Sequence, residues 1–255
     1  MSRLSQLMTV LFFANLGLHL FGEERRFVLM VMLYNETNEE RIREYQYCFD
    51  INSKNKMIGH MHVLYDTSKD NNENILRDYI EDNGATVTEI TGRASFDYFF
   101  SIANNWYPNS YIIIANADII FDDTLELLVD FDFANTFMGL TVYDKNKKGE
   151  WKLRTCHGRA STRSQDSWLF KAPITIPHSE NILLGTWRCD DSIAFAAYKE
   201  KYRVINPCFS IKTYHIHDSK IRHYSIAKSD KNKKDTRPTP WTYLDGSRNK
   251  KGMKK

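Results

Sequence analysis

Short apolar runs alternate with segments of helical pattern from Arg26 onward, and this alternation restricts the fold more than any other feature of the chain. Phe27 to Leu33 is a continuous apolar run of strand length, which is typical of a strand buried on both faces. Further strand-like runs cover 61–65, 87–90, 111–115, 137–143, 167–170 and 210–217. The pattern predicts an α/β domain with a mostly parallel central sheet flanked by helices.

Helical spacing of apolar residues fills the gaps between these runs. Asn83 and Gly84 form a helix stop. Asp123 and Glu126 stand at the spacing of a capping box, which predicts that Asp123 caps a helix. The expected helices cover 38–49, 71–82, 96–105, a segment after Asp123, and 191–200.

The two ends of the chain differ from its middle. A mostly apolar run from Leu7 to Phe21 is shorter than the roughly 20 residues that span a bilayer. Residues 1–25 are therefore expected to be a signal peptide or a membrane-associating segment, with a helix packed on the domain as the alternative. Residues 225–255 carry a net charge of +7, against +3 for the whole chain, and are expected to form a disordered tail. One domain is predicted between them, over 26–224.

Localisation follows from the N-terminal run. A signal peptide implies a membrane-associated protein or one in the ER or Golgi lumen of a eukaryote, whereas a run that is no signal implies the cytoplasm.

The four cysteines, Cys48, Cys156, Cys189 and Cys208, include no Cys-x-x-Cys pair, which disfavours a zinc or redox site. One or two disulfides and four buried thiols both agree with this spacing.

Polar residues follow several of the apolar runs, at the strand ends where open α/β sheets bind ligands. These residues are Asn35, Asp66, Arg93, Asn116 and Asp118. The last two are separated by one residue, so in an extended segment they face the same side. An amide oxygen beside a carboxylate suits a hard divalent cation that also holds phosphate oxygens. An Asx turn without a ligand is the alternative.

The order of these motifs resembles that of GT-A glycosyltransferases, the family 2-like enzymes in particular. The resemblance rests on the strand ends above and continues through 164–170, 185–192, 202–207 and 215–217, so it spans roughly residues 27–224. It implies a GT-A-like, Rossmann-like single domain. It also implies transfer of a sugar from a nucleoside diphosphate sugar to a hydroxyl of a glycan, lipid or protein acceptor, with inversion.

The resemblance further implies a metal site. Asn116 takes the place of the first Asp of an Asp-x-Asp motif, and Asp118 matches the second, which usually binds the metal. A late histidine completes the site in the related fold, and His215 and His217 lie on one face of a strand, so either is a candidate ligand. A surface histidine pair is the alternative. The implied cofactor is Mn²⁺ or Mg²⁺.

The resemblance assigns the remaining site residues as well. Asp190 and Asp191 match the acidic base at the start of the helix after the acceptor loop, although carboxylates there also cap helices. Adjacent carboxylates tend to raise the pKa of one of them, which suits a general base. The expected substrate-binding residues are Asn35, Asp66, Arg93, Asn104, Asn116, Asp166, Trp168 and Trp187, with core packing as the alternative for the two tryptophans.

Two other functions agree with the sequence. An inactive sugar- or nucleotide-binding relative is favoured by Asn116, which removes one negative charge from the metal motif. A nucleic-acid binder would use the basic tail, but the basic clusters lack interleaved aromatic residues apart from Trp241 and Tyr243, so no nucleic acid is expected. The tail is instead expected to contact anionic membrane surfaces.

Overall fold

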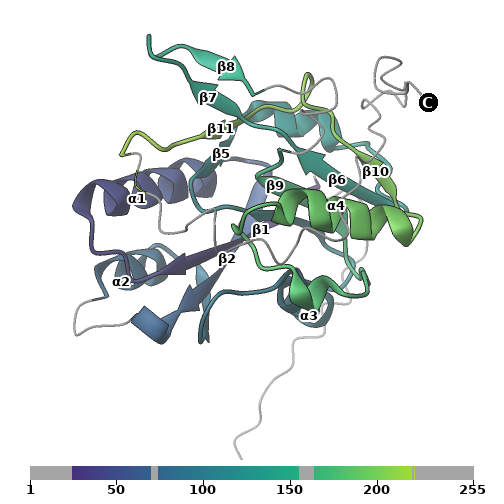
Figure 1. Ribbon diagram of the computed structural model, residues 1–255, viewed down its shortest axis with the longest axis horizontal. Helices are drawn as coiled ribbons and strands as arrows, with labels where there is room; N and C mark the ends of the chain where they lie inside the picture. Colours follow the sequence, from purple (N-terminus) through teal and green to yellow (C-terminus); the bar gives the residue numbers. More distant parts are fainter. Residues whose placement is uncertain (1–24, 70–73, 155–163, 220, 222–255) are drawn as a thin grey trace, which may run out of the picture.

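A seven-stranded sheet forms the centre of the computed structural model, which describes residues 25–69, 74–154, 164–219 and 221 (Figure 1). The strand order is β10-β6-β9-β4-β1-β2-β3. These strands are β1 (Phe27–Tyr34), β2 (Ile58–Asp66), β3 (Thr86–Ile90), β4 (Tyr111–Ala115), β6 (Thr136–Leu140), β9 (Ser167–Lys171) and β10 (Arg203–Ile205). The predicted fold class, an α/β domain with a mostly parallel sheet, is confirmed.

Strand β9 is the exception to the parallel arrangement. Strands β1 to β4 run parallel in the order β4-β1-β2-β3, and β10 runs parallel to β6. Strand β9 lies between β4 and β6 and is antiparallel to both. Its first residue, Ser167, therefore lies beside Ala115 and Leu140, the last residues of its neighbours.

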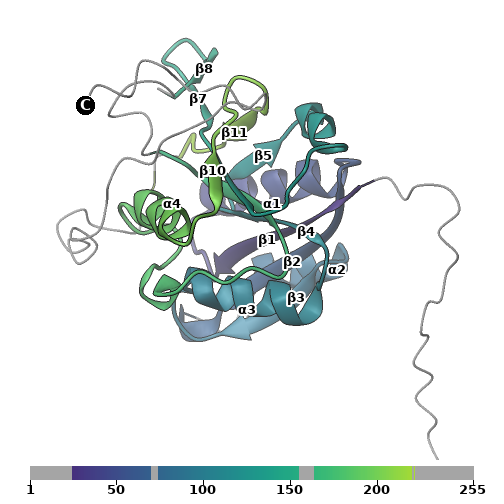
Figure 2. The same cartoon turned by 90° about the vertical axis from the view of Figure 1, so that its right-hand side faces the viewer.

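Helices cover both faces of the sheet, and each face has its own core (Figure 2). Helices α1 (Glu39–Ser53) and α2 (Ile75–Asp82) pack on one face, and α3 (Phe96–Trp106) and α4 (Cys189–Lys199) pack on the other. Successive side chains of β1 point to opposite faces, so Leu29 joins the first core and Met30 the second. The apolar run predicted to be buried on both faces is buried on both.

A second, four-stranded sheet was not predicted. Its order is β5 (Ile119–Phe121), β11 (Thr213–His215), β7 (Tyr143–Lys145) and β8 (Trp151–Leu153). The strand expected over 137–143 is in fact divided between β6 and β7. Between them, the Thr141 amide leaves the ladder and donates to Asn206 Oδ1 at 3.3 Å. The strand expected over 210–217 is ordered as β11 over only part of that range.

The predicted helix ends are partly correct. Helix α2 stops at Asn83 and Gly84, whose φ of 85° lies in the left-handed region that glycine tolerates. The predicted cap at Asp123 is wrong, because the 3₁₀-helix Asp123–Leu128 is capped by Asp122. The Asp122 carboxylate accepts from the Thr124 amide at 3.0 Å, whereas Asp123 is exposed.

Several predictions concern residues outside the described part of the chain, namely most of the 1–25 segment, the 225–255 tail and Cys156. Cys208 is disulfide-bonded, whereas Cys48 and Cys189 are free, buried thiols. No helix among the described residues has both the length and the apolarity needed to cross a bilayer.

Candidate active site

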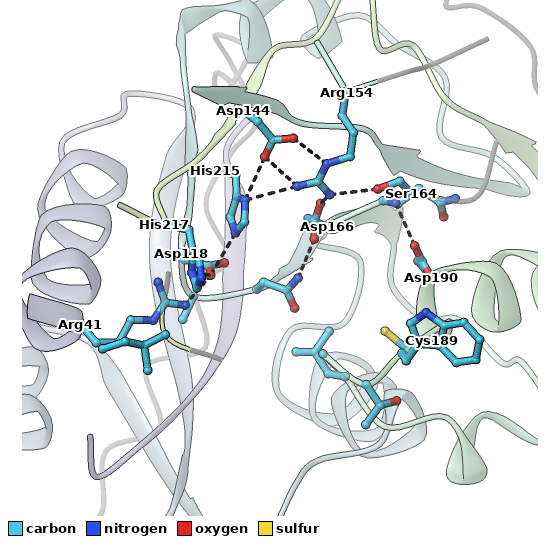
Figure 3. Close-up of a pocket in the computed structure, with 18 of the residues that line it drawn as sticks. Arg41, Asp118, Asp144, Arg154, Ser164, Asp166, Cys189, Asp190, His215 and His217 are labelled. Atoms are coloured by element: carbon cyan, nitrogen blue, oxygen red, sulfur yellow. Dashed lines mark hydrogen bonds and ion pairs between the residues drawn. The ribbon is translucent and has the colours of Figure 1, made fainter. Parts of the chain in front are cut away.

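A cavity of about 910 Å³ lies where the ends of several strands meet (Figure 3). The carboxyl ends of β1 and β4, the segments that precede β9 and α4, and the residues around β7 and β11 all line it. Because β9 is antiparallel to β4, its amino end lies at this edge of the sheet. The cavity thus occupies the place where open α/β sheets bind ligands.

Asp118, His215 and His217 form a compact group on one wall of the cavity. The turn between β4 and β5 carries Asp118, and its backbone carbonyl accepts from the Ile216 amide at 2.8 Å. The two histidines on either side of Ile216 therefore stand beside the carboxylate. Their rings stack with centroids 5.3 Å apart, and one potential ligand atom from each of the three residues lies within 4.8 Å of the others.

This group has the free lone pairs that a cation needs. Asp118 Oδ1 and both ring nitrogens of His217 are buried and have no hydrogen-bond partner among the described residues. Burial is the largest cause that lowers the pKa of His217. Its ring is therefore neutral at pH 7 and can act as a ligand. One carboxylate and two imidazoles fit a divalent metal ion.

Arg41 provides positive charge at the same wall. This buried residue of α1 donates from Nη2 to Asp118 Oδ2 at 2.5 Å and from Nη1 to Glu44 Oε2 at 2.6 Å. Burial favours the neutral acid of Asp118, but His215 and Arg41 outweigh it and hold the pKa of this carboxyl well below its usual range. Asp118 is therefore ionised.

His215 lies between two carboxylates. Its Nε2 is 3.3 Å from Asp118 Oδ2, and its Nδ1 is 3.0 Å from Asp144 Oδ1. Burial opposes protonation, but the hydrogen bonds to the two carboxylates raise the pKa of His215 to about 10. In the metal-free protein the ring is thus an imidazolium that neutralises part of this negative charge.

Arg154 connects the group of Asp118, His215 and His217 to the segment before β9. Its guanidinium donates to both oxygens of Asp144 at 2.7 Å and to Asp166 Oδ2 at 2.6 Å. Asp166 Oδ1 in turn accepts from Asn116 Nδ2 at 3.0 Å. Asn116 therefore holds the segment before β9 through its amide nitrogen, which an aspartate at this position could not do.

Asp190 and Asp191 begin helix α4 but have different surroundings. Asp190 lines the cavity, where its carboxylate accepts from the backbone amides of Gln165 and Asp191 at 3.3 and 3.0 Å. Burial first, and then the charge of Asp191, raise the pKa of Asp190 to about 7. Asp191 is buried and lies 3.6 Å from the Arg188 guanidinium. Asp190 is the carboxyl group that substrate can reach.

Arg93 enters the cavity next to a glycine. Its Nη1 donates to the Leu184 carbonyl at 2.8 Å. A Cβ atom on Gly185 would lie only 2.8 Å from this nitrogen, and the φ of Gly185 is +70°. Glycine at this position therefore allows both the turn and the close approach of Arg93.

The cavity brings together most of the predicted site residues, namely Arg93, Asn116, Asp118, Asp166, Trp187, Asp190, His215 and His217. Five others do not line it. Asn35 and Trp168 are buried, and Asp191 is buried beside Arg188. Asp66 accepts from the Ser68 and Gly92 amides, and the Asn104 side chain bonds to the backbone amide and carbonyl of Ile174. The Trp168 indole packs edge-on against Phe96 in the core, so no sugar can stack on it.

Sequence reasoning missed Arg41, Asp144 and Arg154. Each contacts a predicted site residue through a charge-assisted hydrogen bond. Arg41 is separated from Asp118 by 77 positions, and no motif links the two residues. The only sequence signal for Arg41 was a cation among the apolar positions of an expected helix.

Comparison with solved structures finds this fold in several transferases, although no family model and no curated protein matches the sequence. GalNAc-T7, solved with UDP, GalNAc and Mn²⁺, is 10% identical with a TM-score of 0.50, and the match covers 75% of this chain and 43% of that one. The mannosyltransferase PcManGT from Pyrobaculum calidifontis, solved with GDP-Man and Mn²⁺, is 15% identical with a TM-score of 0.50, and the match covers 74% of this chain and 57% of that one. S. aureus TarS 1-349 is 13% identical with a TM-score of 0.50, and the match covers 82% of this chain and 69% of that one. At these identities the likeness establishes the GT-A-like fold.

Proposed function

We propose that this protein is a glycosyltransferase that moves a sugar from a nucleoside diphosphate sugar to a hydroxyl of a glycan, lipid or protein acceptor, with inversion. One observation carries the proposal: a single cavity holds both an Asp-His-His group suited to a metal ion and a carboxyl group with a pKa near 7. The fold, shared with proteins solved with UDP and with GDP-Man, supports the choice of donor.

Asp190 is the proposed general base. It would accept the proton of the acceptor hydroxyl while that oxygen forms a bond to the anomeric carbon. The bond from this carbon to the phosphate oxygen breaks, and its electron pair leaves with the nucleoside diphosphate. A pKa near 7 suits this role, because the base is then partly ionised at neutral pH and still binds a proton well.

Asp118, His215 and His217 are the proposed ligands of a divalent cation. When bound, such an ion supplies positive charge that stabilises the leaving diphosphate. Imidazole suits transition metals, whereas Mg²⁺ prefers oxygen ligands, so the donor set favours Mn²⁺ over Mg²⁺. Arg93 and Asn116 line the same cavity and are the proposed donor-binding residues.

A ligand screen tests the proposal directly. Thermal unfolding of the full chain would be followed with UDP, GDP and their sugars, each with and without Mn²⁺. We expect one nucleotide to raise the melting temperature, and more so with Mn²⁺, and the matching nucleotide sugar to release nucleoside diphosphate when acceptor is supplied. Absence of stabilisation by every nucleotide, with and without Mn²⁺, would contradict the proposal.

The contact of Arg41 with Asp118 favours a second candidate, an inactive relative that binds a nucleotide or sugar without metal. In that case the guanidinium permanently occupies one carboxylate oxygen of the cation site. Nucleotide would then stabilise the protein equally with and without Mn²⁺, and no diphosphate would be released.

An oxidising compartment is part of the proposal. Cys208 is disulfide-bonded, and disulfides persist mainly in secreted and lumenal proteins. This supports a place in the secretory lumen rather than the cytoplasm. Alkylation of the protein from cells with and without prior reduction would test it.

A further inference from the structure

We propose that Arg41 is a built-in counter-cation of the metal site, which lowers the affinity of Asp118 for a divalent ion until its guanidinium is displaced. The inference rests on the cation site proposed above, but not on the transfer reaction. It assigns a function to a residue that the proposed chemistry does not use.

The contact involves the oxygen that faces both histidines. Asp118 Oδ2 accepts from Arg41 Nη2 at 2.5 Å, and the same oxygen lies 3.3 Å from His215 Nε2 and 3.9 Å from His217 Nδ1. Arg41 is 5% exposed, so water screens its charge little. A divalent ion at this oxygen would meet a fixed positive charge at close range.

Arg41 also has partners that remain when it leaves Asp118. Its Nη1 donates to Glu44 Oε2 at 2.6 Å and to the Ile216 carbonyl at 3.2 Å, and its guanidinium lies 4.4 Å from the centre of the Tyr45 ring. Glu44 is held in turn by the amide and hydroxyl of Ser219. The guanidinium therefore need not become unpaired, so two carboxylates share one cation and a metal ion can compete for one of them.

If Arg41 only held the ligands in place, its removal would change the metal affinity in the opposite direction. Arg41 links α1 to Asp118 and to the segment that carries His217, so its loss could also disorder the ligands. If the role of Arg41 were purely structural, removing it would weaken metal binding. If it is a counter-cation, removing it strengthens metal binding, and the sign of the change separates the two roles.

The experiment is a Mn²⁺ titration of the full chain, with free Mn²⁺ measured by electron paramagnetic resonance and no nucleotide present. We expect Arg41→Gln to bind Mn²⁺ at least tenfold more tightly than the parent. Arg41→Lys, which keeps the charge, should remain within about threefold of the parent. Arg43→Gln is the matched control, because it removes the same charge from the exposed side of the same helix, where Arg43 pairs with Glu39 at 3.4 Å.

Equal or weaker binding by Arg41→Gln overturns the inference, as does equal tightening by Arg41→Lys or Arg43→Gln. If Arg41→Gln fails to fold, Arg41→Gln/Glu44→Gln removes both charges of the buried pair while residue 44 can still accept from Ser219, and it should also bind Mn²⁺ more tightly than the parent. Tight Mn²⁺ binding without sugar transfer would refute the proposed reaction and leave the role of Arg41 intact.

Discussion

Two neighbouring carboxylates of the candidate site have different surroundings, and substitution can separate their roles. Asp190 faces the cavity, whereas Asp191 is buried beside Arg188. We expect Asp190→Asn to lower kcat by a factor of about 10²–10⁴ with donor affinity nearly unchanged, because a general base acts in the transition state. Asp191→Asn should retain at least a tenth of the activity. Steady-state kinetics with the donor identified by the ligand screen measures both, and equal losses would contradict the assignment.

The pH dependence of the reaction should report the same carboxyl group. Burial and the charges of Asp191 and Asp166 raise the pKa of Asp190 to about 7, and the base must be ionised to accept a proton. At saturating Mn²⁺, kcat should therefore rise as the pH increases through about 7 and then level off. The residual activity of Asp190→Asn should lack this step. A parent profile that is flat from pH 5 to 9 would exclude Asp190 as the base.

Asp118 and Arg41 form a buried ion pair, so their substitutions should be coupled in stability. Asp118→Asn removes one of the two carboxylates that pair with Arg41, and loss of one partner of a buried pair costs up to about 3 kcal/mol. Arg41→Gln/Asp118→Asn removes both charges of this pair, and only Glu44 then lacks its cation, so the double variant should be less destabilised than the sum of the single changes. Urea unfolding without metal measures all three variants. Strict additivity would show that the pair is not coupled.

Among the secondary-structure elements, the short 3₁₀-helix Asp123–Leu128 tests which aspartate is the cap. Asp122 accepts from the Thr124 amide and also from the Tyr214 hydroxyl at 3.0 Å, so it joins this helix to β11. Asp122→Ala should lower the free energy of unfolding by about 1–2 kcal/mol. Asp123→Ala, at an exposed position, should change it by less than about 0.5 kcal/mol. The reverse order in urea unfolding would contradict the assigned cap.

The elements that could be predicted are those with a local cause. The apolar run of β1, the glycine stop of α2 and the start of α3 each depend on neighbouring residues, and the structure has all three. The second sheet has no such cause. Strands β5, β7, β8 and β11 are three residues each and form only because segments far apart in the sequence meet. A strand of three residues has no period long enough to recognise.

At the scale of the whole molecule, a buried histidine outside the site should make stability depend on pH. His62 is fully buried and bonded to the Tyr107 hydroxyl and Thr88 Oγ1, both at 2.8 Å. Burial, with a smaller effect of His60, lowers the pKa of His62 to about 4. The unfolded chain therefore binds more protons than the folded one between about pH 4 and 6.5. The contribution of His62 is fully present above pH 6.5 and is lost as the pH falls towards 4.

Urea unfolding of the parent and of His62→Gln at pH 7 and pH 5 measures this contribution. We expect the parent to lose more stability between the two values than the variant does, because glutamine does not titrate. Asp190 acts in the opposite direction, since its raised pKa makes the folded state lose stability as the pH rises from about 4 to 7. Because the parent and His62→Gln both contain Asp190, comparing them cancels its contribution to stability. Identical losses in both would show that His62 does not contribute.

The candidate site was predictable where strand ends supply it and not where distant charges meet. The resemblance indicates Asp118, either of His215 and His217, and either of Asp190 and Asp191, and the fold brings all of these except Asp191 to one cavity. The pairing of Arg41 with Asp118, over 77 positions, depends on how α1 packs against the sheet. That packing depends on residues far apart in the chain, so no short motif indicates it.

The reversed direction of β9 brings two kinds of segment to the cavity rim, those that follow a strand and one that precedes a strand. At the parallel strands β1 and β4, the residues that follow the strand reach the cavity rim, whereas at β9 the residues that precede the strand do. The segment before β9 and the start of α4 meet through the hydrogen bond from the Gln165 amide to Asp190. Because Asn116 donates to Asp166 at 3.0 Å, an insertion in the segment before β9 is expected to change the position of the residues after β4 as well.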